Sequence, residues 1–194
     1  MSRDVVRQVA GWCLQYPDSG VLSKLPLLRA CAEEAGHAGL ARVLDHLGGP
    51  PAELAAHYVE TFDRKPRRTL HLTWFTDGDT RRRGTSLATL KRLYREHGFV
   101  LAENELPDFL PVILEFSTAV RDRGAAEGVL LRFRPALELL HRNLVSVTPY
   151  AEAVAAVIGT LPPPDPESER LAASLAETGP PAELVGLEPF GVGR

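Results

Sequence analysis

Apolar residues recur three and four positions apart through most of the first 160 residues, which is the pattern of amphipathic α-helices. Clusters of proline, glycine and aspartate interrupt this pattern, for example at residues 17–20 and 48–51. The one strand-like run, LHLTWF at residues 70–75, has no obvious second run to pair with. The sequence therefore predicts an all-α fold, organised as a single-domain helical bundle.

The most hydrophobic helical segment is residues 106–120, where apolar side chains cover more than one face. Such a helix is expected at the centre of a bundle, because a surface helix shows a single apolar stripe. Pro107 suits its first turn, whereas Pro111 falls one turn further on and predicts a bend. Residues 124–147 are expected to form another long helix, with a second bend at Pro135.

The composition changes after Leu161, where PPPDP is followed by residues rich in proline, glycine and glutamate. Such a segment cannot bury enough apolar surface to hold itself firmly. We therefore expect a helical domain over residues 1–161 and a linker with a loosely structured tail over residues 162–194. Within that tail, residues 167–177 have the composition of one further short helix.

Residues 63–84 keep neither the helical nor the strand period and are crowded with charged, threonine and aromatic side chains. We expect a long irregular loop here, and connections of this length in compact domains are usually functional or mobile. Trp74 and Phe75 lie on this movable loop. They either fill the core or anchor a partner, since aromatic side chains dominate interface energetics, and the sequence leaves both readings open.

Charge is distributed unevenly along the chain. Residues 63–96 carry ten Lys and Arg against four Asp and Glu, a net of +6, so the remainder is −9 within an overall net charge of −3. The chain thus has a basic band, residues 64–95, on an acidic body. No recognised nucleic-acid-binding motif surrounds the band, so a solvated helix start or the rim of a peptide site explains it better than nucleic-acid binding.

Catalytic and metal-binding patterns are nearly absent. There is no phosphate-binding glycine loop and no nucleophile elbow, and the pair His57 and Glu60 has no second pair with which to share a metal. Cys13 and Cys31 are isolated thiols, which indicates a reducing compartment. No signal-peptide core and no apolar run of roughly 20 residues occurs, so we expect a soluble cytoplasmic protein that is not an enzyme.

Several short motifs together resemble one family. They are YVETFD at residues 58–63, LHLT at 70–73, Gly78-Asp79, Arg83-Gly84 and ELPD at 105–108, with YPD at 16–18, Pro149-Tyr150 and EPFG at 188–191. The chain resembles the NarJ-type chaperones, also called the delta subunit or molybdenum-cofactor assembly chaperone of respiratory nitrate reductase. These belong to the TorD/DmsD-like superfamily of redox-enzyme maturation chaperones.

The resemblance implies an all-helical domain that binds no cofactor stably. Its implied partner is the apo catalytic (alpha) subunit of nitrate reductase, bound through its N-terminal segment in the cytoplasm. The chaperone would assist insertion of the molybdenum bis-guanine-dinucleotide cofactor into that subunit, with cofactor-biosynthesis proteins as further candidate partners. The alternatives are a chaperone of the same fold for another molybdoenzyme, a nucleic-acid-associated regulator using the basic band, and, ranked last, an enzyme with a hidden site.

A peptide site is expected in a groove between helices, near residues 58–63 and 105–113. Apolar burial and charge complementarity there would both favour a basic amphipathic peptide. The motif carries Phe109 where the wider superfamily usually has a histidine, so no imidazole role transfers to this position. The candidate residues are Tyr58, Phe62, Asp63, Trp74, Phe75, Glu105, Asp108 and Phe109.

Overall fold

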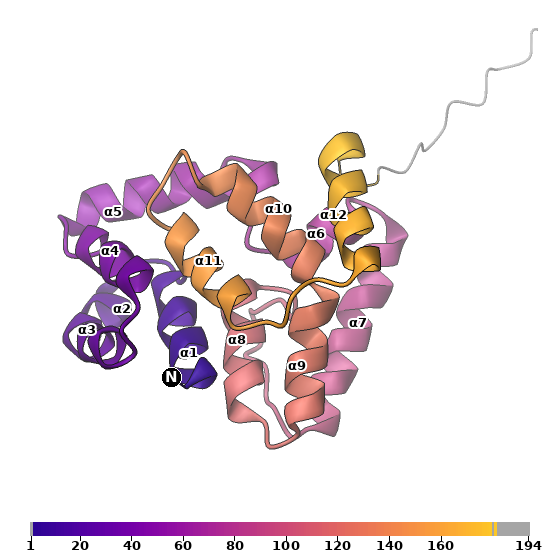
Figure 1. The fold of residues 1–194 in the computed structure, drawn as a ribbon, viewed down its shortest axis with the longest axis horizontal. Helices are drawn as coiled ribbons and strands as arrows, with labels where there is room; N and C mark the ends of the chain where they lie inside the picture. The colour runs from indigo at the N-terminus through magenta and orange to yellow at the C-terminus, as the bar shows by residue number, and fades with distance from the viewer. Residues whose placement is uncertain (1, 180, 182–194) are drawn as a thin grey trace, which may run out of the picture.

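The computed structural model describes residues 2–179 and 181, and within them the chain is built from helices and turns without any named strand (Figure 1). The all-α prediction is confirmed. The α-helices are α1 (Arg3–Cys13), α2 (Ser19–Leu22), α3 (Leu25–Glu34), α4 (Ala38–His46), α5 (Pro51–Tyr58), α6 (Leu72–Asp77), α7 (Arg81–Glu96), α8 (Leu110–Ala119), α9 (Arg123–Arg132), α10 (Arg134–Leu144), α11 (Ala151–Gly159) and α12 (Pro166–Thr178).

Helix α8 lies in the core, as its hydrophobicity predicts. It packs against α1 on one side and α9 on another, and Leu110, Ile113, Leu114 and Phe116 are fully buried. The α1–α8 approach is close because α1 carries Gly11 at the crossing, where a Cβ would already lie 3.4 Å from the Leu114 Cβ. Helix α11 packs against α1, α4 and α10, and so closes the bundle (Figure 1).

A buried arginine ties three helices together inside this bundle. Arg7 of α1 is fully buried; its Nε donates to Thr160 Oγ1 at 2.9 Å and its Nη2 to Glu127 Oε2 at 2.9 Å. Thr160 follows α11 and Glu127 belongs to α9. A charge taken out of water must be paired and hydrogen-bonded, so these contacts fix how the three helices meet.

The two expected proline bends are wrong, and the reason is the same in both cases. The apolar helix begins at Leu110 rather than at residue 106, so Pro111 lies in its first turn, where no hydrogen bond is lost. Residues 124–147 form two helices that meet at Phe133, and Pro135 lies in the first turn of α10. Both prolines begin helices rather than bend them.

The expected long irregular loop over residues 63–84 is also wrong, because short helices occupy most of it. Helix α5 continues into a π-helical turn (Val59–Asp63), a 3-10 turn follows (Pro66–Arg68), and then come α6 and the start of α7. Trp74 and Phe75 therefore lie on a helix. Within the strand-like run only His71 makes a β-bridge, to Phe109.

The short helix expected over residues 167–177 is confirmed as α12. It packs against α10 and buries Ala172 and Leu175. The boundary at residues 161 and 162 stays a prediction. The motif at residues 188–191 and the expected tail from residue 182 lie outside the described residues.

Candidate functional site

The Asp108 carboxylate is the centre of a buried polar network. Thr73 donates to Asp108 Oδ2 from its backbone nitrogen, at 3.3 Å, and from its hydroxyl. His71 Nδ1 lies 3.1 Å from Oδ1, and Arg83 Nη2 lies 3.6 Å from Oδ2. Arg83 Nε also donates to Thr73 Oγ1 at 3.2 Å. The network therefore joins the 70–73 segment, the first turn of α7 and the approach to α8.

Backbone hydrogen bonds hold the same two segments in register. The Leu72 nitrogen donates to the Asp108 carbonyl at 3.0 Å, and the Leu110 nitrogen donates to the Leu70 carbonyl at 2.9 Å. Burial alone would raise the pKa of the Asp108 carboxyl. Hydrogen bonds from His71 and Thr73 and the charges of His71 and Arg83 outweigh burial, so the pKa lies below its ordinary value. Asp108 is thus an internal anion that holds the fold together.

A second cluster consists of aromatic rings at the end of α5. Tyr58 and Phe62 are buried with their ring centroids 4.8 Å apart, and Tyr150 packs on both, at 6.0 and 5.2 Å. The Tyr58 hydroxyl donates to the Leu14 carbonyl at 3.0 Å. Tyr16, which is 47% exposed, covers Tyr58 edge-on at 5.4 Å. Only the outer edge of this cluster reaches the surface.

A crevice of about 260 Å³ opens between α1 and α8, and we call it the α1–α8 crevice. Its walls include Arg7 and Trp12 from α1, Gln15 just after that helix, and Pro111 and Glu115 from α8. Burial raises the pKa of the Glu115 carboxyl, and the negative charge of Glu105 raises it further. One carboxyl group, that of Glu115, lines this crevice, and the apolar surface of Trp12 and Pro111 suits an anchor side chain of a bound segment.

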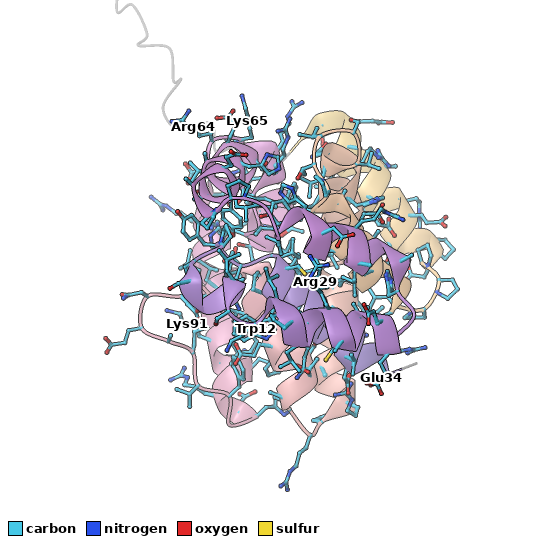
Figure 2. All side chains as sticks on the ribbon, turned by 90° about the vertical axis from the view of Figure 1, so that its left-hand side faces the viewer. Trp12, Arg29, Glu34, Arg64, Lys65 and Lys91 are labelled. Carbon is cyan, nitrogen blue, oxygen red and sulfur yellow. The ribbon has the colours of Figure 1, made fainter. Side chains whose placement is uncertain are left out.

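A second concave surface surrounds Trp74, and we call it the Trp74 hollow. Its volume is about 560 Å³, and its lining residues are Lys65, Pro66, Arg67, Arg68, Trp74 and Asn143. Figure 2 shows Arg64 and Lys65 at one end of the molecule, away from Trp12, so the Trp74 hollow and the α1–α8 crevice are separate surfaces.

The eight predicted site residues do not share one surface. Four of them, Tyr58, Phe62, Phe75 and Asp108, are buried and do not face solvent. The remaining four reach solvent in full or in part: Asp63 and Glu105 are exposed, and Trp74 and Phe109 are half-buried. The negative charge of Glu105 acts on Glu115 of the α1–α8 crevice, whereas Trp74 lines the Trp74 hollow. A peptide site formed by these eight residues stays a prediction.

Sequence reasoning did not single out Trp12, Gln15, Pro111 or Glu115 as site residues. Trp12 fits the helical period of α1 and looks like an ordinary core position, although it is half-buried and carries Lys24 Nζ over its ring at 4.9 Å. No local signal distinguishes it, because the crevice is formed by two helices about 100 residues apart in the chain.

Reactive and metal-binding groups are scarce in the described part of the chain. No cluster of three or more His, Cys, Asp or Glu there could hold a metal ion. Burial raises the pKa of the Cys13 thiol to about 12, which makes it an unreactive core side chain. Among the described helices, none has the length and apolar character needed to cross a membrane.

The fold and the site define an all-helical protein with a partly apolar crevice between α1 and α8 and no catalytic constellation in the described residues. The family model for the nitrate reductase delta subunit matches residues 29–141, so this chain belongs to the nitrate reductase delta subunit family. That match covers more than half of the chain and includes the Asp108 network together with Tyr58 and Phe62 of the aromatic cluster.

Individual relatives agree with the family. The chain is 38% identical over 159 residues to the nitrate reductase-like protein NarX of Mycobacterium tuberculosis, a match that covers 81% of this chain and 24% of NarX. It is 31% identical over 164 residues to the probable nitrate reductase molybdenum cofactor assembly chaperone NarJ of Bacillus subtilis, covering 82% and 89%. It is 31% identical over 138 residues to NarJ of Escherichia coli K12, covering 68% and 58%. The chain thus spans about a quarter of the mycobacterial relative.

Proposed function

We propose that this protein is a chaperone for the assembly of a respiratory nitrate reductase. The observation that carries the proposal is membership of the delta subunit family, with a NarJ relative aligned over most of both chains. That relative, from Bacillus subtilis, is described as a probable nitrate reductase molybdenum cofactor assembly chaperone. On this proposal the chain acts in the cytoplasm, before the reductase is complete, and is not an enzyme.

The client segment would be the N-terminal part of the apo catalytic subunit, bound in the α1–α8 crevice. The crevice offers apolar contact from Trp12 and Pro111, while negative charge comes from Glu115 in its wall and from Glu105, whose charge acts on Glu115. A basic amphipathic helix satisfies both features, because its apolar face buries anchor residues and its charges meet the carboxylates. Binding there would keep the segment from premature contacts.

The molybdenum cofactor would belong to the client and not to this chain. The chaperone would then act by holding the client open for insertion. Cofactor-biosynthesis proteins are further candidate partners on this proposal.

Calorimetric titration tests the proposal directly. The full chain is titrated with a synthetic peptide of the first 20 or so residues of the nitrate reductase catalytic subunit from the same organism. We expect a Kd of about 1 μM or tighter, which corresponds to about −8 kcal/mol. The double variant Glu105→Gln/Glu115→Gln should weaken binding about tenfold, because it removes both negative charges.

A matched control keeps the charge change and moves it away from the crevice. The double variant Glu33→Gln/Glu34→Gln alters two exposed carboxylates at the end of α3 and should bind the peptide like wild type. Absence of binding by wild type would overturn the proposal. Equal binding of N-terminal peptides from unrelated molybdoenzymes would point instead to a chaperone of the same fold with another client.

A further inference from the structure

The Trp74 hollow has the chemistry of a recognition surface and takes no part in the proposed client site. Its lining combines one half-buried aromatic ring with three basic residues, and it contains no acidic side chain. Trp74 is held in place by Phe75, whose ring lies 5.3 Å away, edge-on. A half-buried aromatic ring that packs on a neighbouring side chain and keeps one part open to solvent is suited to anchor a partner.

The basic residues of the hollow are presented on a fixed turn. Arg67 and Arg68 end the 3-10 turn, and Asn143 of α10 donates to the Arg67 carbonyl at 2.7 Å, which ties this backbone to the bundle. Within the part of the chain that the structure describes, neither guanidinium has an ion-pair partner. By contrast, Arg83 is turned inward to Asp108, and Arg64 lies 3.3 Å from Glu60.

One helix of the same chain, α12, already packs beside this surface. A smaller cavity of about 100 Å³ continues from the hollow, sharing Arg67, Trp74 and Asn143, and its other wall is the end of α12 with Leu175 and Glu177. Residues 165–178, which form α12 and its N-cap, carry four acidic residues against one arginine. The C-terminal end of this acidic helix therefore already lies beside Trp74, where Glu177 is the acidic residue that lines the cavity and Leu175 is buried.

We propose that the Trp74 hollow docks an acidic segment of a second protein partner, with one apolar side chain as its anchor. The anchor packs on Trp74, and flanking carboxylates pair with Arg67 and Arg68, whose guanidinium groups suit bidentate contacts. This partner has the opposite charge preference to the basic client. The proposal does not depend on the client, because the two surfaces are separate (Figure 2).

Nucleic acid fits this surface less well than an acidic protein segment does. The exposed carboxylates of Glu60 and Asp63 lie in the turn just before the basic residues, and Glu177 closes the far end of the cavity. These charges would repel a phosphate backbone running through the hollow. A short protein segment avoids them, because its contact is limited to the anchor and its nearest carboxylates.

The chain has two tryptophans, one on each surface, so a single spectrum reports on both. The full chain is labelled with ¹⁵N and titrated with a synthetic peptide of residues 165–178, an acidic amphipathic probe. We expect a saturable shift of the Trp74 indole N–H signal while the Trp12 signal stays in place. The same peptide with its four acidic residues replaced by amides should bind about tenfold more weakly.

Variants of the chain separate recognition from general charge. The double variant Arg67→Glu/Arg68→Glu should weaken peptide binding about tenfold or more. Arg121→Glu, an exposed arginine in the turn between α8 and α9, should leave binding unchanged. Circular dichroism melts establish that each variant is folded, and Arg67→Gln/Arg68→Gln serves if the charge reversal perturbs the fold.

Three results would overturn the proposal. The first is no shift of Trp74 up to millimolar peptide, and the second is a shift of Trp12 in its place. The third is tighter binding at Trp74 by a twelve-nucleotide oligothymidine than by the peptide, which would make this a nucleic-acid surface. Binding of the client peptide, read at Trp12, is a separate measurement, so failure here leaves the proposed function intact.

Discussion

Arg83 Nη2 lies 3.6 Å from the Oδ2 atom of Asp108, a carboxylate that is fully buried while the arginine reaches it from the first turn of α7. This pair connects the first turn of α7 to the segment before α8, and Tyr94 at the other end of α7 packs on Phe116 of α8, with ring centroids 4.5 Å apart. The ELPD and LHLT motifs therefore meet in one buried polar network, because Thr73 donates a hydrogen bond to the same carboxylate.

Asp108→Asn removes the negative charge from this network while keeping the size and shape of the side chain. We expect the free energy of unfolding to fall by about 3 kcal/mol, because Arg83 loses its buried partner and His71 its charged acceptor. Urea unfolding followed by circular dichroism measures the change. The exposed control Asp63→Asn should stay within about 0.5 kcal/mol of wild type. Equal effects of the two substitutions would show that the network carries no stability.

The same carboxylate predicts a dependence of stability on pH. The ordinary pKa of 3.8 applies in the unfolded chain, and the folded pKa is lower. The unfolded chain therefore binds the proton first as pH falls, so the stabilisation is full well above pH 3.8 and is lost through the lowered folded pKa. The stability difference between wild type and Asp108→Asn should be constant near neutral pH and narrow below about pH 4. A difference that persists unchanged at pH 3 would contradict this assignment.

Helical periodicity predicted the buried faces well. Leu54, Tyr58 and Phe62, spaced four residues apart, are buried, and so are Leu90 and Tyr94, which have the same spacing. Apolar spacing predicts burial here because each of these helices packs one face against the core, and the residues of that face recur at the helical period. The same pattern could not show where helices begin, which is why Pro111 and Pro135 were misplaced.

The role of Asp108 could not be predicted from its local sequence. An acidic residue before an apolar helix resembles an exposed rim, and nothing near it reveals burial. Its hydrogen-bond partner Thr73 lies 35 residues away, and Arg83 comes from another helix. Helix α6 was missed for a related reason, since its six residues are too few to display a period.

Two buried tyrosines should respond oppositely to loss of the hydroxyl. The Tyr58 hydroxyl donates to the Leu14 carbonyl, whereas the Tyr150 hydroxyl is buried without a protein partner among the described residues. Tyr58→Phe should cost about 1 to 2 kcal/mol of unfolding free energy, and Tyr150→Phe should be neutral or stabilising. Thermal and urea unfolding of both variants test the contrast. The assignment fails if Tyr150→Phe is the more damaging change.

Gly78 permits a close approach that no other residue allows. Its φ is +62°, and an added Cβ would lie 1.7 Å from the Pro181 carbonyl oxygen. Gly98 has a similar φ of +70° but open space around it. Gly78→Ala should therefore lower the free energy of unfolding by about 3 kcal/mol. Gly98→Ala should lower it by about 1 kcal/mol, because it introduces backbone strain without a steric clash. Similar losses in both variants, measured by urea unfolding, would mean that the contact with Pro181 is of no consequence.

Trp12 should be the strongest apolar contributor to client binding in the α1–α8 crevice. Its ring lines the crevice and is half-buried in the free protein, so a bound segment can cover the remainder. Trp12→Ala should weaken binding of the catalytic-subunit peptide by about 2 kcal/mol, which is a roughly thirtyfold rise in Kd. The salt dependence of binding should stay as in wild type, because the carboxylates of Glu105 and Glu115 are untouched. Leu27→Ala, an exposed apolar residue on α3, is the matched control and should bind normally. Unchanged peptide affinity in a folded Trp12→Ala protein would move the client site away from this crevice.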